Sequence, residues 1–100
     1  MVAAPNPEPL DAAMTAQYEL IRQRFVAGLK GRQQEIDAAD NPATLHSALH
    51  RLAGAAGGFG FPDLDRLARE ALRAHEAGAA EQMPACLDRL KKEIHRLTAP

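Results

Sequence analysis

The sequence predicts an all-α protein, an up-down antiparallel four-helix bundle in a single domain. Hydrophobic residues make up 46% of the chain and aromatic residues only 4%. Much of the apolar content is alanine, which favours closely packed helices over a β-sandwich. Four stretches carry apolar residues at helical spacing, and the short breaks between them predict antiparallel neighbours. A chain of 100 residues suffices for one such domain and not for two.

The N-terminal part is predicted to be a flexible tail over residues 1–9, followed by the bundle domain over residues 10–98. The prolines at positions 5, 7 and 9 disfavour regular structure in the tail. From about Leu10 to Ala39 the apolar residues lie on or near one helical stripe, which is typical of a helix packed against a core. These residues are Tyr18, Ile21, Phe25, Leu29 and Ile36. Gly28 and Gly31 weaken the helical pattern locally.

The second helix is predicted to begin at the break Asp40-Asn41-Pro42. Asn41 suits the N-cap, where its side chain accepts a hydrogen bond from a free N–H group, and Pro42 suits the first helical position. The apolar residues that follow are spaced by four, three, four and three, and we expect this stripe to face the core. They are Leu45, Leu49, Leu52, Ala56 and Phe59.

Two further helices complete the predicted bundle. Pro62 opens the third helix and Gly78 ends it, while Asp65 and Arg69 have the spacing of an i,i+4 ion pair. The apolar face of this helix is formed by Leu64, Leu67, Ala68, Ala71 and Leu72. The last helix begins near Met83, with apolar residues at Met83, Leu87, Leu90, Ile94 and Leu97.

Charge and cysteine content exclude several classes of function. The net charge is −1, so no overall electrostatic attraction favours nucleic acid or an anionic membrane as a partner. Cys86 is the only cysteine, which rules out an internal disulfide and fits a reducing compartment. No apolar run has the length of a membrane span, and no signal-peptide pattern is present. We therefore expect a cytoplasmic protein.

The stretch from Leu45 to Gly60 differs from a helix selected for packing alone. Its second half is rich in glycine, and each glycine in a helix costs about 1 kcal/mol relative to alanine. His50 lies about 100° round the helix from Leu49, at the edge of the buried stripe or outside it. Helical side chains lean toward the N-terminus, so glycine at position 54 leaves the imidazole uncovered on that side. We interpret the small residues as giving a partner access to His50.

The segment from His50 to Gly60, HRLAGAAGGFG, resembles the signature of histidine-containing phosphotransfer (HPt) domains. That signature is roughly histidine, any residue, leucine, lysine, glycine, two small residues, two variable positions, an apolar residue and glycine. The matching positions are His50, Leu52, Gly54, Ala55, Ala56, Phe59 and Gly60. The following Phe61-Pro62-Asp63-Leu64 looks like the family's turn into its third helix. The resemblance extends from about Tyr18 to Leu97.

The resemblance implies a phosphorelay intermediate in two-component signalling. His50 would accept a phosphoryl group from an aspartate of a receiver domain and pass it to a response regulator. The implied partners are receiver domains and a sensor or hybrid histidine kinase, and the receiver would supply Mg²⁺, so no cofactor of the bundle's own is expected. The chain would be a carrier without independent turnover rather than an enzyme. One histidine face suffices for a 1:1 encounter, so we expect a monomer.

The residues expected to shape the partner-binding surface around His50 are His46, Leu49, Arg51, Ala53, Gly54 and Gly57. One of them departs from the family pattern. Many members have lysine where this chain has Ala53, and that lysine is thought to help hold the incoming phosphoryl group. The positive charge is left to Arg51, Arg69 or Arg73, or to the partner's own cation.

Three other interpretations stay open at this point. His46 and His50 have the i,i+4 spacing of zinc ligands, and His75, Glu70 or Asp65 would be candidates for a third. The glycines from Gly54 to Gly60 would suit a phosphate-binding loop, but no strand precedes them and no Gly-Lys-Ser/Thr follows. A docking bundle that binds a receiver or kinase through the same face without being phosphorylated is the third alternative.

Overall fold

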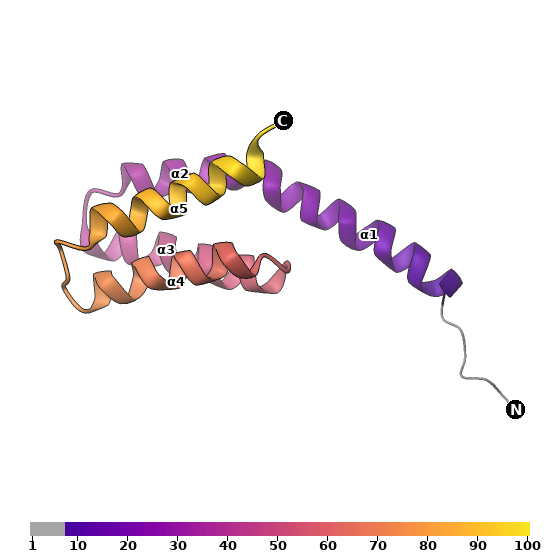
Figure 1. Ribbon diagram of the computed structural model, residues 1–100, viewed down its shortest axis with the longest axis horizontal. Coiled ribbons are helices and arrows are strands. Elements are labelled where there is room, and N and C mark those ends of the chain that lie inside the picture. The colour runs from indigo at the N-terminus through magenta and orange to yellow at the C-terminus, as the bar shows by residue number, and fades with distance from the viewer. Residues whose placement is uncertain (1–7) are drawn as a thin grey trace, which may run out of the picture.

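The structure, a computed structural model, describes residues 8–100 and consists of five helices in that range, with no strand among them. The helices are α1 (Glu8–Ala27), α2 (Leu29–Ala38), α3 (Pro42–Gly58), α4 (Pro62–Glu76) and α5 (Met83–Thr98). In Figure 1, α2 to α5 lie together in one bundle, and α1 extends away from one end of it.

The helices α2 to α5 form the bundle that the sequence predicts. Contacts join α2 to α3, α3 to α4, α4 to α5 and α5 back to α2, so the four helices surround one core. Since short connections link helices that are successive in the chain, neighbours run antiparallel. The prediction of an all-α, up-down antiparallel four-helix bundle is confirmed.

The start of α3 is fixed by the cap that the sequence predicts. The side-chain oxygen of Asn41 accepts a hydrogen bond from the backbone N–H of Thr44 at 2.9 Å, and Pro42 occupies the first turn. This bond satisfies one of the backbone donors that every helix start leaves free. The cap therefore sets where α3 begins, eight residues before His50.

The ends of α3 and α4 have the same hydrogen-bonding pattern, the Schellman motif. Gly60 has φ of +82° and Gly78 has φ of +68°, in the left-handed region that favours glycine. Beyond α3, the N–H of Phe61 donates to the carbonyl of Ala56 at 2.9 Å. Beyond α4, the N–H of Ala79 donates in the same way to the carbonyl of Ala74 at 2.9 Å. These bonds end both helices sharply and turn the chain back along the bundle.

The core is built mainly of leucine and alanine. Its fully buried large side chains are Leu29, Leu49, Leu52, Leu64, Leu90 and Ile94. The predicted face of α4 is buried throughout, as is Cys86 on α5. Alanines fill the remaining space on α3 and α4, at positions 48, 53, 56, 68, 71 and 74. Small buried side chains on both helices allow their backbones to approach closely.

The N-terminal segment differs from the prediction in two ways. The helical stretch from Leu10 to Ala39 is divided at Gly28 into α1 and α2, and the apolar side chains of Tyr18 and Ile21 remain 49% and 42% exposed. The α1 helix leads away from the bundle, so these two positions have no core to face (Figure 1). The prediction of a tail over residues 1–9 is also wrong for its last two residues, because Glu8 and Pro9 belong to α1. Residues 1–7 lie outside the described residues.

The last turns of α1 are anchored on the turn between α3 and α4. The ring of Phe25 lies 5.1 Å from that of Phe59 and 5.3 Å from that of Phe61, measured between centroids. Arg22 donates a hydrogen bond to the carbonyl of Phe59 at 3.2 Å and places its guanidinium 4.6 Å from the centroid of the Phe61 ring. This end of α1 is therefore part of the packed structure.

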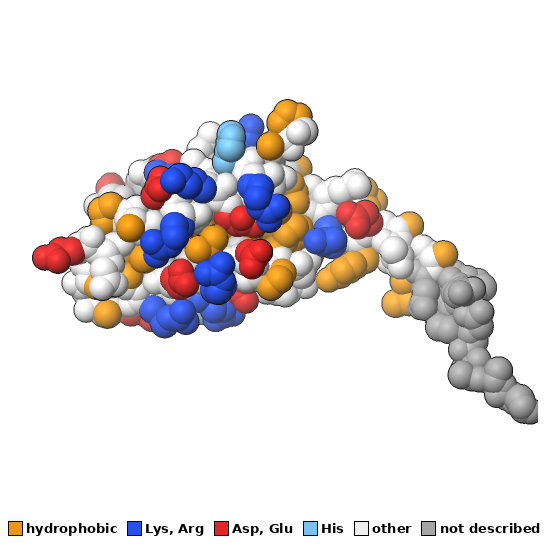
Figure 2. Space-filling model, in the orientation of Figure 1, with side chains coloured by type: hydrophobic (Ala, Val, Ile, Leu, Met, Phe, Trp, Pro, Cys, Tyr) orange, Lys and Arg blue, Asp and Glu red, His pale blue; other side chains and the backbone are white. Residues whose placement is uncertain are grey.

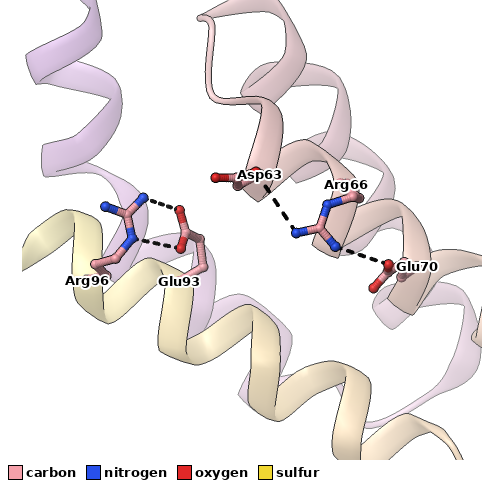
Figure 3. Close-up of polar contacts among 5 residues, drawn as sticks. All are labelled: Asp63, Arg66, Glu70, Glu93 and Arg96. Atoms are coloured by element: carbon pink, nitrogen blue, oxygen red, sulfur yellow. Dashed lines mark hydrogen bonds and ion pairs between the residues drawn. The ribbon is translucent and has the colours of Figure 1, made fainter.

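Ion pairs cover the outer surface of α4 and α5 (Figure 3). Arg66 lies 3.3 Å from Glu70 on α4, and Arg96 makes two hydrogen bonds to Glu93 on α5, at 2.9 and 2.6 Å. The hydrogen bond from Arg96 lowers the pKa of Glu93, whose side chain is only 13% exposed. Figure 2 shows acidic and basic side chains interspersed over this face, while hydrophobic side chains show along α1. Of the helices in residues 8–100, none is long and apolar enough to cross a membrane.

Candidate functional site

The candidate site is centred on His50, on the outer side of α3. Leu49 and Leu52 are fully buried, and their positions orient α3 so that His50 is exposed. Within residues 12–100, no hydrogen bond engages the His50 ring. An exposed imidazole on a rigid helix presents a nitrogen lone pair to a partner in a fixed direction, which is what a nucleophile needs.

A second histidine, His46, lies beside His50, and its ring contacts a carboxylate on α4. The rings of His46 and His50 are nearly parallel, with an interplanar angle of 7° and centroids 6.1 Å apart. Nε2 of His46 lies 3.0 Å from a carboxylate oxygen of Glu76. His75 lies 6.2 Å from His46 between ring centroids, and its own Nε2 is 3.0 Å from the carbonyl of Pro42.

Arg51, Arg69 and Arg73 were the candidates for the positive charge that the lysine supplies in other family members. In the structure, each of them lies against other side chains of the bundle. Arg51 is bound 2.8 Å from Glu35 on α2, and Arg69 lies 2.7 Å from Asp65 on its own helix. The latter contact is the ion pair that the sequence predicts. Arg73 lines a groove together with residues of α4 and α5.

The glycines of α3 have two different surroundings. A Cβ atom added at Gly54 would meet nothing within 4 Å, so this side of the helix is open, as expected. A Cβ atom at Gly57 would lie only 3.1 Å from a carboxylate oxygen of Asp65. Gly57 is itself exposed, and the Asp65 side chain of α4 lies beside it.

Two of the predicted partner-binding residues belong to the core. Leu49 is 0% exposed and Ala53 is 1% exposed, because both lie on the inner side of α3. Their side chains cannot form part of a docking surface on this structure. Ala53 instead belongs to the small buried side chains that let α3 and α4 pack closely. The exposed or half-exposed members of the predicted set are therefore His46, Arg51, Gly54 and Gly57.

The two alternative chemical sites find no support in the geometry. Among the described residues, no group of three or more His, Cys, Asp or Glu side chains is arranged to hold a metal ion. The glycines at 54, 57 and 58 belong to α3, and Gly60 belongs to the motif that ends it. They do not form a separate loop around a phosphate.

Glu76 and Glu35, the carboxylates that contact His46 and Arg51, were not predicted from the sequence. The first follows from the register of the helix pair once one contact between α3 and α4 is known. Gly57 faces Asp65 and His46 faces Glu76, so positions 11 residues apart on α3 meet positions 11 residues apart on α4. That constant register follows from two antiparallel helices of equal rise. No comparable signal pointed to Glu35.

Comparison with known proteins gives one family match. The family model described as Hpt domain matches residues 11–100. The comparisons with curated proteins and with solved structures give no match. Proteins of the matched family are phosphotransfer carriers that interact with receiver domains and kinases in two-component phosphorelays. With an all-α bundle and a family match over most of its length, the chain belongs to the Hpt domain family, with a histidine phosphotransfer role in phosphorelays.

Proposed function

We propose that His50 is the phosphorylated residue and that the chain relays a phosphoryl group between two receiver domains. The observation that supports this most is the exposure of His50 in the middle of α3, with open space at Gly54 and no hydrogen bond to its ring within the described residues. The other exposed histidine on a helix surface, His95 near the end of α5, has no such glycine-rich surroundings.

The proposed transfer is an in-line displacement at phosphorus. The Nε2 lone pair of neutral His50 forms the new N–P bond, while the P–O bond to the receiver aspartate breaks and its electron pair returns to the carboxylate. The proton on the other ring nitrogen leaves later to solvent. Imidazole suits this role because a large fraction is uncharged near neutral pH. Attack by a second receiver's aspartate reverses the process.

The bundle's contribution in this proposal is positioning. Phosphoryl transfer depends mostly on alignment and charge stabilisation. The divalent cation, Mg²⁺, comes from the receiver, and the bundle needs no cofactor of its own. We also propose that the chain acts as a monomer, in a 1:1 encounter, and that the exchange takes place in the cytoplasm, as expected for a chain with a lone cysteine.

Labelling by phosphorylated receiver domains tests the proposal. The chain is mixed with a panel of receivers phosphorylated with radioactive phosphate, and acid-labile, base-stable label on the chain is measured. We expect labelling of the natural chain and of His95→Gln, and none of His50→Gln. Labelling of His50→Gln would place the acceptor elsewhere. Binding of a receiver without any labelling would favour the docking-module alternative.

A further inference from the structure

A groove of about 440 Å³ is formed by α4, α5 and the connection between them. Its floor consists of small side chains, two of which, Ala74 and Cys86, are only 7% and 6% exposed. Ala77 and Ala79 leave the groove open near the end of α4. Four larger polar side chains complete the lining, and they are Glu70, Arg73, Gln82 and Arg89. In the described part of the chain no residue of α3 lines this groove, so a partner seated in it leaves His50 uncovered.

Arg73, which is exposed on α4, differs from the other arginines of that helix. Arg66 lies 3.3 Å from Glu70, four residues later. Arg69 lies 2.7 Å from Asp65, four residues earlier. Neither the residue four positions before Arg73 nor the one four positions after it is acidic, so the helix offers it no such partner. Over residues 12–100, no carboxylate oxygen lies within 4.0 Å of its guanidinium group.

The second guanidinium group at the groove belongs to Arg89 on α5. One of its nitrogens lies 3.5 Å from the sulfur of Cys86, so this side chain extends over the floor. Its contact with Glu70 is 3.9 Å long, against 3.3 Å for the contact between Glu70 and Arg66. The described lining therefore holds two guanidinium groups and a single carboxylate that other arginines share, and its net charge is positive. The chain as a whole carries a net charge of −1.

Positive charge beside a floor of small side chains suits an acidic peptide in an extended conformation. Successive side chains of an extended chain point to opposite sides, so a segment that alternates acidic and small residues presents each kind to different surroundings. The small side chains cover the alanine floor, and the carboxylates accept hydrogen bonds from the guanidinium groups, whose paired N–H donors match a carboxylate. A single small anion would leave the apolar floor uncovered.

We propose that the groove between α4 and α5 is a docking site for an acidic, extended segment of a partner protein, bound through Arg73 and Arg89. This inference goes beyond phosphotransfer and does not depend on which residue accepts the phosphoryl group. Because His50 on α3 stays uncovered, a partner attached by such a segment leaves the histidine free to meet a receiver.

The test is a titration of the isotope-labelled chain with the peptide Ala-Glu-Ala-Glu-Ala, its termini blocked, followed by amide NMR shifts at low ionic strength. We expect saturable shifts at the groove residues, and none with Ala-Lys-Ala-Lys-Ala. Arg73→Gln and Arg89→Gln should each weaken binding about fivefold, the order of one exposed ion pair. Ala77→Leu should also weaken it, because leucine fills the groove without changing the charge.

Arg24→Gln is the matched control, since it removes an exposed arginine of α1 that lies outside the groove, and it should bind the acidic peptide as the natural chain does. Circular dichroism melting checks that each variant is folded.

Four results would overturn the proposal. The first is no binding of the acidic peptide to the natural chain, and the second is equal binding by the natural chain and Arg73→Gln. The third is a loss with Arg24→Gln as large as that with Arg73→Gln, since attraction would then come from overall charge. The fourth is displacement of the peptide by a single-stranded oligonucleotide that binds more tightly through the same two arginines, which would make the groove a nucleic-acid site.

Discussion

The helical hairpin of α3 and α4 and the part of α1 that precedes its last turns both carry apolar residues at helical spacing but have different surroundings. On α3 and α4, leucines alternate with alanines, both helices end in Schellman motifs, and their inner faces are buried against each other. On α1 the apolar residues Met14, Tyr18, Leu20 and Ile21 are exposed. Spacing alone makes a helix amphipathic, and burial requires a second helix that returns alongside it. The hairpin carries His50, and its buried inner face holds the backbone beneath the imidazole in place.

Large-to-small substitutions should separate the two regions most strongly. Leu52→Ala removes a fully buried side chain from the hairpin, and we expect it to lower the free energy of unfolding by about 3 kcal/mol. Ile21→Ala on α1 is the matched control, with an expected change within about 0.5 kcal/mol, because that side chain is 42% exposed. Urea denaturation measures both. Similar losses for the two variants would mean that α1 packs as tightly as the hairpin.

Two glycines of α3 test the close approach of α4. Gly54→Ala should raise the free energy of unfolding by about 1 kcal/mol, since alanine is the better helix former and its Cβ meets nothing within 4 Å. Gly57→Ala gains less or nothing, because its Cβ would lie 3.1 Å from a carboxylate oxygen of Asp65, which Arg69 holds. A larger gain at position 57 than at 54 would contradict the hairpin geometry described here.

An ion pair on α5 should have a smaller effect than these substitutions, and the effect should appear in the pH dependence of the free energy of unfolding. The pKa of Glu93 is lowered in the folded protein by its hydrogen bond from Arg96. The folded protein therefore binds a proton at Glu93 less readily than the unfolded chain does. The resulting stabilisation is fully present above the pKa of Glu93 in the unfolded chain. It is lost as the pH falls through the lower pKa of Glu93 in the folded protein. Glu93→Gln should lower stability at neutral pH by less than about 1 kcal/mol and flatten its decline toward about pH 3. Parallel acid limbs in urea titrations of the two proteins would refute this.

The comparison also explains what could be predicted from the sequence. The cap at Asn41, the terminating glycine at 78 and the buried faces of α3 and α4 depend on short-range rules, and the structure confirms them. The exposure of Tyr18 and Ile21 depends on the direction of α1 relative to α2, on the two sides of Gly28, which no local rule sets.

The same distinction applies to the candidate site, where local rules predict some features and contacts between helices determine the others. The position of His50 outside the buried stripe follows from helical periodicity. The partners of His46 and Arg51, and the contact of Gly57 with Asp65, depend on how helices meet in space. The burial of Ala53 depends on the same packing. These residues lie far apart in the sequence, so periodicity within one helix says nothing about which of them meet.

Transfer of a phosphoryl group through the chain tests whether the hairpin presents His50 as a two-way phosphoryl carrier. A receiver labelled with radioactive phosphate and an unlabelled second receiver are mixed with the chain, and the label on the second receiver is followed over time. We expect label to reach the second receiver only when the chain is present, with His95→Gln supporting transfer equally well and His50→Gln abolishing it. Transfer supported by His50→Gln, or none with the natural chain and any receiver pair, would contradict it.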